Sequence, residues 1–277
     1  ADGTRKPEWG FVGVYGKLLL AGVGFGDFSE RLGYEYTPAS KRGMAWSPDR
    51  SASLGLSAFD RHTGRVLWNV DATHSFLHNA IVAGAGRIYC LDKLPSRVEG
   101  QIRRRGRELP DYRLVALDAA TGQILWERTD ITFGTWLGYS AEHDILLQAG
   151  AAASDRSPDE TGKGMATFRG ADGSLLWENA NLSYAGPCMI HNDLIITNTR
   201  SYSPSQGAFR LNDGNPATIT HPITGEPVAW TVMRTYGCNT AVASEHLLTF
   251  RSGAAGFYDL DGHGGTGNFG GFKSGCT

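Results

Sequence analysis

One segment near the C-terminus has the residue types of a cation site. In Asp259-Leu260-Asp261-Gly262, two carboxylates alternate before a glycine, an arrangement that suits a hard cation such as calcium. No acidic residue follows before Thr277, so the bidentate ligand that closes an EF-hand loop is missing. Two interpretations therefore stay open, a calcium site at Asp259 and Asp261 or a plain glycine-rich turn.

The cysteines do not form a recognisable metal or haem motif. They are Cys90, Cys188, Cys238 and Cys276, and no pair has CxxC or CxxCH spacing, so a zinc ribbon or a c-type haem is not indicated. Their disulfide pairing cannot be assigned from spacing. A bridge between Cys238 and Cys276 is one hypothesis. The sequence also lacks a GxSxG hydrolase elbow and an HExxH pair.

Composition narrows the class of protein. Of 277 residues, 37 are glycine and 10% are aromatic, which suits many short strands joined by tight turns. The net charge of −2 gives no reason to expect nucleic acid or an anionic membrane as partner. No apolar run approaches the roughly 20 residues that span a bilayer. The chain begins with Ala1 rather than Met and contains no signal peptide, so we expect that it has been processed or cut from something longer.

An internal repeat determines the predicted fold. An apolar strand, a turn ending in glycine and a short strand ending in tryptophan recur along the chain. The copies are Ala58-Phe59-Asp60-Arg61-His62-Thr63-Gly64-Arg65-Val66-Leu67-Trp68, Ala116-Leu117-Asp118-Ala119-Ala120-Thr121-Gly122-Gln123-Ile124-Leu125-Trp126, Thr167-Phe168-Arg169-Gly170-Ala171-Asp172-Gly173-Ser174-Leu175-Leu176-Trp177, and an interrupted copy in which Ala208-Phe209-Arg210-Leu211 precedes Thr224-Gly225-Glu226-Pro227-Val228-Ala229-Trp230. The tryptophans are 58, 51 and 53 residues apart, a spacing typical of propeller blades.

The repeated residues have structural roles in this interpretation. Gly64, Gly122, Gly173 and Gly225 are predicted to adopt the left-handed backbone of the turn. Asp60 and Asp118, four residues earlier, can accept hydrogen bonds from the backbone of the turn. Trp68, Trp126, Trp177 and Trp230 are predicted to pack between blades and to donate hydrogen bonds through their indole nitrogens.

The predicted fold is an all-β propeller of four-stranded antiparallel blades. Each tryptophan is followed by an alternating strand and then by a very apolar strand such as Ile145-Leu146-Leu147. The single propeller segment spans residues 1–277, with blades at about 9–70, 71–128, 129–180, 181–232 and a partial blade at 233–277. Because propellers close with about four to eight blades, the chain is predicted to be an incomplete ring. No strand with a glycine turn and tryptophan is expected in the last blade.

The innermost strands should hold any ligand site. When the blades are aligned on their apolar strands, one rim of the channel is predicted to carry Trp9, Asn79, Trp136, Ala185 and Cys238, with His78, Arg234 and Asn239 beside them. Two aromatic platforms and polar groups could hold a flat ligand. The alternative is that these side chains plug the channel or pack between blades.

The repeat resembles the tryptophan-docking repeat of the PQQ-repeat (quinoprotein dehydrogenase-like) β-propellers, a family that also includes non-catalytic members and large exported bacterial proteins. For a quinoprotein enzyme, the resemblance implies pyrroloquinoline quinone on the propeller axis. It also implies a supporting tryptophan, an adjacent cysteine pair, a calcium ion and an aspartate base. This sequence has no adjacent cysteine pair.

The sequence therefore leaves two functions open. The first is a binding or scaffold module of a periplasmic or extracellular bacterial protein, with a protein, a glycan or a small molecule as partner and the remaining blades supplied by a longer parent chain. The second is a quinone-dependent dehydrogenase that oxidises an alcohol or a sugar. A basic insertion between Pro95 and Pro110 is interpreted as a solvated loop or short helix, or as a site for an anion or partner.

Overall fold

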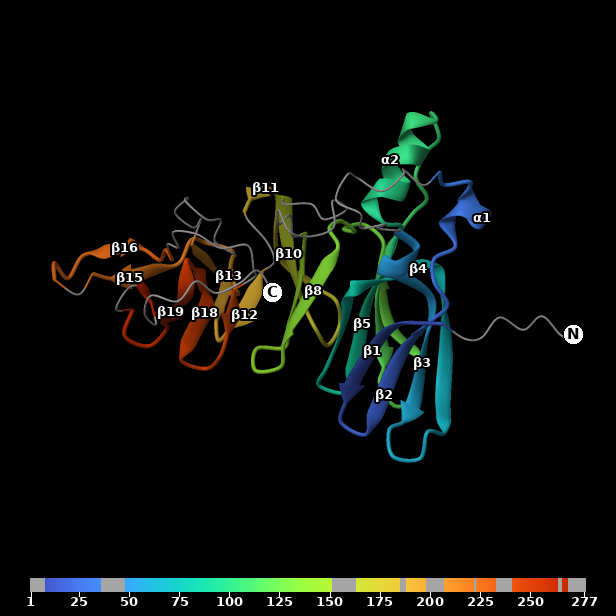
Figure 1. Cartoon of the computed structure of the whole chain (residues 1–277), viewed down its shortest axis with the longest axis horizontal. Coiled ribbons are helices and arrows are strands. Elements are labelled where there is room, and N and C mark those ends of the chain that lie inside the picture. The colour runs from blue at the N-terminus through green and yellow to red at the C-terminus, as the bar shows by residue number, and fades with distance from the viewer. Residues whose placement is uncertain are drawn as a thin grey trace, which may run out of the picture. The chain divides into compact units, whose positions relative to one another are not determined.

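The computed structural model describes residues 8–35, 48–150, 163–184, 188–197, 207–221, 223–232, 241–263 and 266–268. Almost every element in these ranges is a β-strand, and the strands pair antiparallel, which confirms the predicted all-β fold (Figure 1). The sheets are blades of the β-propeller class. No described helix is long and apolar enough to cross a membrane. The chain divides into two compact units, Ala1–Ala141 with Gly170–Gly173, and Glu142–Arg169 with Ser174–Thr277.

The first unit contains a seven-stranded sheet with its strands in sequence order. These strands are β1 (Trp9–Tyr15), β2 (Leu18–Val23), β3 (Ala52–Asp60), β4 (Val66–Gly84), β5 (Arg87–Asp92), β6 (Arg113–Asp118) and β7 (Ile124–Arg128). Two insertions carry its helices: α1 (Phe28–Leu32) and the 3₁₀ turn η1 (Pro48–Ser51) lie between β2 and β3, and α2 (Ser96–Arg104) lies between β5 and β6. The predicted short helix in the basic insertion is therefore present.

The other four described sheets are smaller. One has the strand order β11-β10-β9-β8, and the others are β12-β13-β14, the hairpin β15-β16, and β17-β18-β19-β20. Their bounds are β8 (Trp136–Ser140), β9 (Ile145–Ala149), β10 (Lys163–Arg169), β11 (Leu175–Ser183), β12 (Met189–His191), β13 (Leu194–Ile196), β14 (Ala208–Arg210), β15 (Thr218–Thr220), β16 (Pro227–Ala229), β17 (Val242–Ala243), β18 (Leu247–Ser252), β19 (Ala254–Asp259) and β20 (Thr266–Asn268).

Strand β4 passes without a break through the boundary predicted at residues 70 and 71. Its first part pairs with β3, and its last part pairs with β5. No glycine or proline interrupts residues 66–83, so nothing in the sequence ends the strand there. Register shifts between Ser53 and Gly55, and between Phe76 and Ile81, let the strand change partners.

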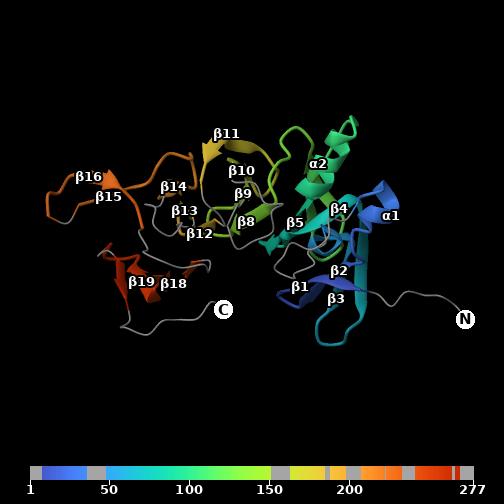
Figure 2. The same ribbon diagram turned by 45° about the horizontal axis from the view of Figure 1, so that its top comes forward.

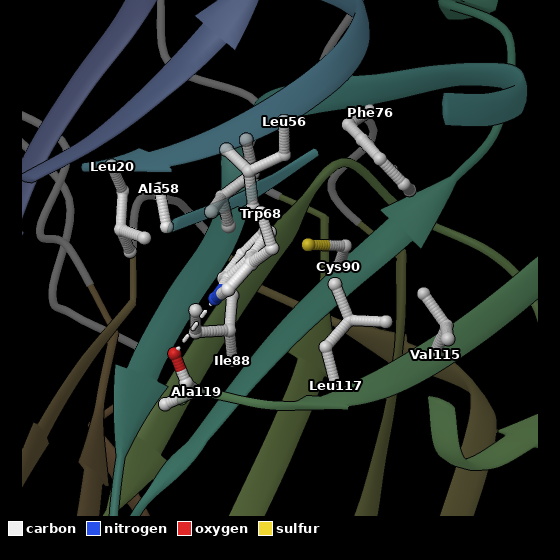
Figure 3. Close-up of a cluster of buried hydrophobic side chains, with 11 residues drawn as sticks. Leu20, Leu56, Ala58, Trp68, Phe76, Ile88, Cys90, Val115, Leu117 and Ala119 are labelled. Atoms are coloured by element: carbon white, nitrogen blue, oxygen red, sulfur yellow. Dashed lines mark hydrogen bonds between the residues drawn. The ribbon is translucent and has the colours of Figure 1, made fainter. Parts of the chain in front are cut away.

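The core of the first unit lies between its repeats. Trp68 from β4 packs with Leu20 and Leu56 of the first repeat and with Ile88 and Leu117 of the second (Figure 3). The second unit has a comparable core around Trp230, which lies edge-on to Tyr258 with 5.3 Å between ring centroids. Burial of such large side chains is a major source of stability in sheets of this kind.

Candidate functional site

The glycine turns have the predicted local structure. The Asp118 carboxylate accepts hydrogen bonds from the backbone nitrogens of Ala120 and Thr121 at 3.0 and 2.8 Å and from the Thr121 hydroxyl at 2.8 Å. These bonds lower the pKa of Asp118 below its ordinary value. Gly122 closes the turn with φ at 73°, a left-handed conformation that glycine adopts without strain. Asp60 and Gly64 form the same turn.

Three tryptophans occupy equivalent places against the next repeat. The indole nitrogens of Trp68, Trp126 and Trp177 donate hydrogen bonds of 3.0, 2.9 and 2.9 Å to the backbone carbonyls of Ala119, Gly170 and Leu211, respectively. Figure 3 shows the first of these bonds. Each accepting residue directly follows the end of the third strand of a repeat. The repeat residues are thus engaged in packing.

A glycine lies under each of these indoles. A Cβ atom built at Gly122, Gly173 or Gly214 would be 2.7 Å from the ring of Trp68, Trp126 or Trp177, respectively. The glycines therefore provide both the left-handed turn and the space for the ring.

The fourth repeat differs from its sequence alignment. Gly214, rather than Gly225, lies against Trp177 and follows the end of β14 by the same four residues as in the other copies. Gly225, with φ at 73°, ends the turn of the additional hairpin β15-β16, and nothing lies within 4 Å of its Cβ position. The alignment at Gly225 was wrong because this second turn also contains a Thr-Gly pair shortly before Trp230.

The last sheet contains a fourth strand, β20, which has no tryptophan, as expected. Gly267 in β20 pairs with Phe257. In the second repeat, Trp126 occupies the equivalent position, opposite Ala116. His263, with φ at 50°, stands where the other repeats have the turn glycine. Asp259 accepts hydrogen bonds from the backbone nitrogens of Asp261 and Gly262, and Asp261 pairs with His246 at 2.8 Å. Calcium binding at Asp259 and Asp261 stays a prediction.

The described residues among those predicted at the channel rim differ in exposure. Trp9 is 43% exposed and lies edge-on to Phe59 with 5.6 Å between ring centroids. Asn79 is exposed on β4, and Trp136 is half-buried at the start of β8. Ala185, Arg234, Cys238 and Asn239 lie outside the described residues. Their shared role at a channel rim stays a prediction.

His78 forms a polar pair that the sequence did not indicate. Its Nε2 atom lies 2.7 Å from the Ser53 hydroxyl, and its ring also hydrogen-bonds to the Arg50 backbone. Gly10 and Gly22 make room for the two side chains, since a Cβ at either position would lie 2.4 Å from them. Burial lowers the pKa of His78 to about 4, so the ring is neutral at physiological pH. Ser53 is fully buried, so its hydrogen bond with His78 is a buried link between β3 and β4.

A buried carboxylate connects the first two repeats beneath the helical insertions. Asp92, at the end of β5, accepts hydrogen bonds of 2.7 to 3.0 Å from the backbone nitrogens of Thr73, His74 and Ser75, and it pairs with Arg113 at 3.0 Å. Four donors around one carboxylate compensate for its complete burial. The middle of β4, where its pairing changes from β3 to β5, is thereby fixed to the end of β5.

Lys93, the residue after Asp92, holds α2 against the sheet through buried contacts. Lys93 is 5% exposed, and its ammonium group donates to Glu99 of α2 and to the Leu94 carbonyl at 3.3 Å. It also lies 5.0 Å from the centre of the Tyr112 ring. Burial and the neighbouring Glu99 raise the pKa of Tyr112. The available signal for this buried cluster was a pair of charged residues, Asp92 and Lys93, enclosed between the apolar run Ile88–Leu91 and Leu94.

The two helices lie side by side at one end of the seven-stranded sheet, as both ribbon views show (Figures 1 and 2). Arg105 donates to the Gly33 carbonyl and to the Glu35 carboxylate, both at 2.8 Å, and Gln101 forms hydrogen bonds with the Glu35 backbone. Arg31 of α1 donates to the His74 carbonyl at 3.1 Å. We call the exposed end of α2 and its following turn, residues 103–108, the arginine end.

The described residues form neither a metal cluster nor a bonded cysteine pair. Within the described ranges, no three His, Cys, Asp or Glu side chains come together as a metal site. Cys90 and Cys188 are free and buried, one in each unit, and burial raises the pKa of both thiols. Trp9 meets Phe59 with the two rings edge-on.

Comparison with known proteins supports the propeller class. The sequence profile described as outer membrane protein assembly factor BamB, a PQQ-repeat profile, matches residues 37–186. This match covers more than half of the chain, so the chain belongs to the PQQ-repeat β-propeller family. None of the curated proteins matches it.

Solved structures with a similar arrangement are distant in sequence. Quinohemoprotein alcohol dehydrogenase ADHIIG from Pseudomonas putida HK5 is 13% identical over 93% of this chain, with a TM-score of 0.39. The C-terminal WD40 domain of Sif2 is 9% identical over 93%, with a TM-score of 0.49. A functionally unknown protein from Desulfotomaculum acetoxidans DSM 771 is 8% identical over 78%, with a TM-score of 0.51. The alignments cover only 34%, 56% and 62% of those chains.

Proposed function

We propose that this chain is a binding and scaffold segment of an exported bacterial protein, and that the arginine end of α2 binds an acidic surface of a protein partner. The observation that supports the proposal is that α2 is held by buried contacts near its start and exposes arginines at its end. Buried contacts hold the start of the helix, whereas Arg103 and Arg104 at its end and Arg107 in the following turn are exposed.

The charges near α2 divide into two groups. Glu99 is engaged by Lys93 inside the protein, and Arg105 is engaged by Glu35 of the neighbouring insertion. Glu108 is the only carboxylate within residues 103–108, beside four arginines. A cluster of one sign on a rigid element attracts an oppositely charged partner and speeds association at low salt.

Arginine also suits recognition of carboxylates. Its planar guanidinium group can bind both oxygens of an Asp or Glu side chain in a bidentate way. The net charge of the whole chain is −2, so the positive charge at this end is local. A local cluster favours one docking orientation over general adhesion to anions.

A direct test uses the full chain and a fluorescent peptide of about twelve glutamate residues. We expect binding that weakens with salt, because exposed charges are screened within about 8 Å at physiological ionic strength. The variant with Arg103, Arg104 and Arg107 all changed to Gln should lose binding. The matched control removes three positive charges elsewhere, through Lys17→Gln, Arg61→Gln and Arg65→Gln, and should bind as the parent does. Equal loss in both variants would mean that only net charge matters.

The dehydrogenase alternative has its own test. The chain is mixed with pyrroloquinoline quinone and calcium, and both the quinone absorbance after gel filtration and dye-linked oxidation of alcohols are measured. The scaffold proposal predicts neither retained quinone nor oxidation. Stoichiometric retention of the quinone would refute it.

A further inference from the structure

One guanidinium group of the arginine end is held in place by the protein itself. Arg105 donates through Nη1 to the Gly33 carbonyl and through Nη2 to the Glu35 carboxylate, both at 2.8 Å. Its backbone nitrogen donates to the Gln101 carbonyl of α2 at 3.1 Å. The side chain is still 34% exposed. Because ordering a flexible side chain is part of the cost of binding, an arginine that is already ordered is better prepared for a ligand.

The contact with Glu35 uses only part of what Arg105 offers. A guanidinium group carries five N–H donors, and the two bonds of its side chain engage two of them. Among the described residues, the edge formed by Nε and Nη2 meets a single carboxylate oxygen, Oε1 of Glu35. A carboxylate that approaches this edge from a partner can bind with both oxygens, which is the stronger, bidentate arrangement.

Glu35 can release Arg105 without loss of the structure around it. The Glu35 backbone nitrogen donates to the Gln101 side-chain oxygen at 3.0 Å, and its carbonyl accepts from the Gln101 side-chain nitrogen at 2.6 Å. These two bonds hold the insertion against α2 and do not involve the carboxylate. The Glu35 side chain is 83% exposed, and ion pairs at such exposed sites contribute little to stability. Rotation of the carboxylate into water therefore has a small cost.

The other ion pair of α2 is different in this respect. The Lys93 and Glu99 side chains are only 6% and 13% exposed, so loss of either partner would leave a buried charge. That pair fixes the helix. The pair of Arg105 and Glu35, at the exposed end of the same helix, is the one that can exchange partners.

We infer that Arg105 is the carboxylate-binding residue of the arginine end, and that Glu35 occupies it until an Asp or Glu side chain of the partner takes its place. This inference rests on the function proposed above and names the residue that makes the specific contact. Arg103, Arg104 and Arg107 attract the acidic surface, and Arg105 then binds one carboxylate with both oxygens. Because the partner has to displace Glu35, this residue acts against weakly acidic partners.

The test measures binding of the fluorescent peptide of about twelve glutamate residues to the full chain at physiological ionic strength. Glu35→Gln keeps the size of the side chain and removes its charge. We expect the Kd to fall about threefold, because an exposed ion pair no longer competes with the peptide. The matched control is Glu30→Gln, which removes the same charge from an exposed position of α1 and leaves both bonds of the Arg105 side chain in place. It should change the Kd much less.

Two substitutions of Arg105 connect the gain to this residue. Arg105→Lys keeps the charge and loses the bidentate geometry, so it should raise the Kd about threefold. In a chain with Arg105→Gln, adding Glu35→Gln should lower the Kd no further than adding Glu30→Gln does, which is the signature of direct coupling in a double-mutant cycle. The gain expected from Glu35→Gln cannot be imitated by a variant that fails to fold, because unfolding would weaken binding.

The results distinguish this inference from the proposed function. Suppose that the parent binds the peptide and that the variant with Arg103, Arg104 and Arg107 changed to Gln does not. Equal effects of Glu35→Gln and Glu30→Gln would then overturn the exchange at Arg105 and leave the arginine end as the binding site. A gain from Glu35→Gln that persists beside Arg105→Gln would overturn the exchange as well. Absence of binding by both the parent and Glu35→Gln would overturn the proposed function itself.

Discussion

Replacing Gly122 and Gly64 by alanine separates backbone strain from indole packing. Both glycines have nearly the same φ, 73° and 72°, so each substitution incurs the same left-handed strain of about 1–2 kcal/mol. Among the described residues, a ring lies over Gly122 but not over Gly64, and the new Cβ at Gly122 would approach Trp68 to 2.7 Å. Trp68 is nearly buried and hydrogen-bonded to Ala119, so it cannot move away freely. Overpacking of this kind adds about 1–3 kcal/mol.

We therefore expect Gly122→Ala to destabilise the first unit by about 2–5 kcal/mol and Gly64→Ala by about 1–2 kcal/mol. Both residues belong to the same unit, so urea unfolding followed by circular dichroism compares them within one transition. Adding Trp68→Ala should abolish the difference, because the ring that the new methyl group meets is gone. Equal losses for the two glycine variants would refute the packing argument.

Two further predictions concern buried ionisable groups. Lys93→Met should cost about 3–5 kcal/mol because it leaves Glu99 charged and nearly buried, and adding Glu99→Leu should recover most of the loss in a denaturation experiment. His78 has a folded-state pKa of about 4 against an ordinary value of 6.5, so the unfolded chain binds its proton more readily. Stability should therefore fall as pH drops from about 6.5 to about 4, by on the order of 3 kcal/mol. His78→Gln should reduce this slope in stability measurements at a series of pH values, and an unchanged slope would assign the effect to other groups.

Sequence reasoning worked where one residue type has one structural use. The repeat of glycine turn and tryptophan predicted the strands, the turns and the all-β fold, because few residues replace glycine at positive φ or an indole between sheets. It misaligned the fourth repeat because Thr224-Gly225 matches the pattern better than Asp213-Gly214. The structure identifies Gly214 by its contact with Trp177.

The polar clusters could not be predicted in the same way. Lys93, Glu99 and Tyr112 meet only because α2 turns back over the end of β5. Ser53 and His78 meet through the register of β3 and β4, which shifts next to Ser53. Such contacts depend on how an insertion or a bulge is folded, and no repeated spacing in the sequence encodes them.

Because β4 runs without a break through the first two repeats, it affects how the chain should unfold under force or heat. In an array of repeats, each unit can unfold separately when only a loose connection joins it to its neighbour. Here a single strand contributes hydrogen bonds to both of the first two repeats, and the Asp92 carboxylate fixes its middle. Loss of either repeat removes pairing from the other, so the two should unfold together in one cooperative step.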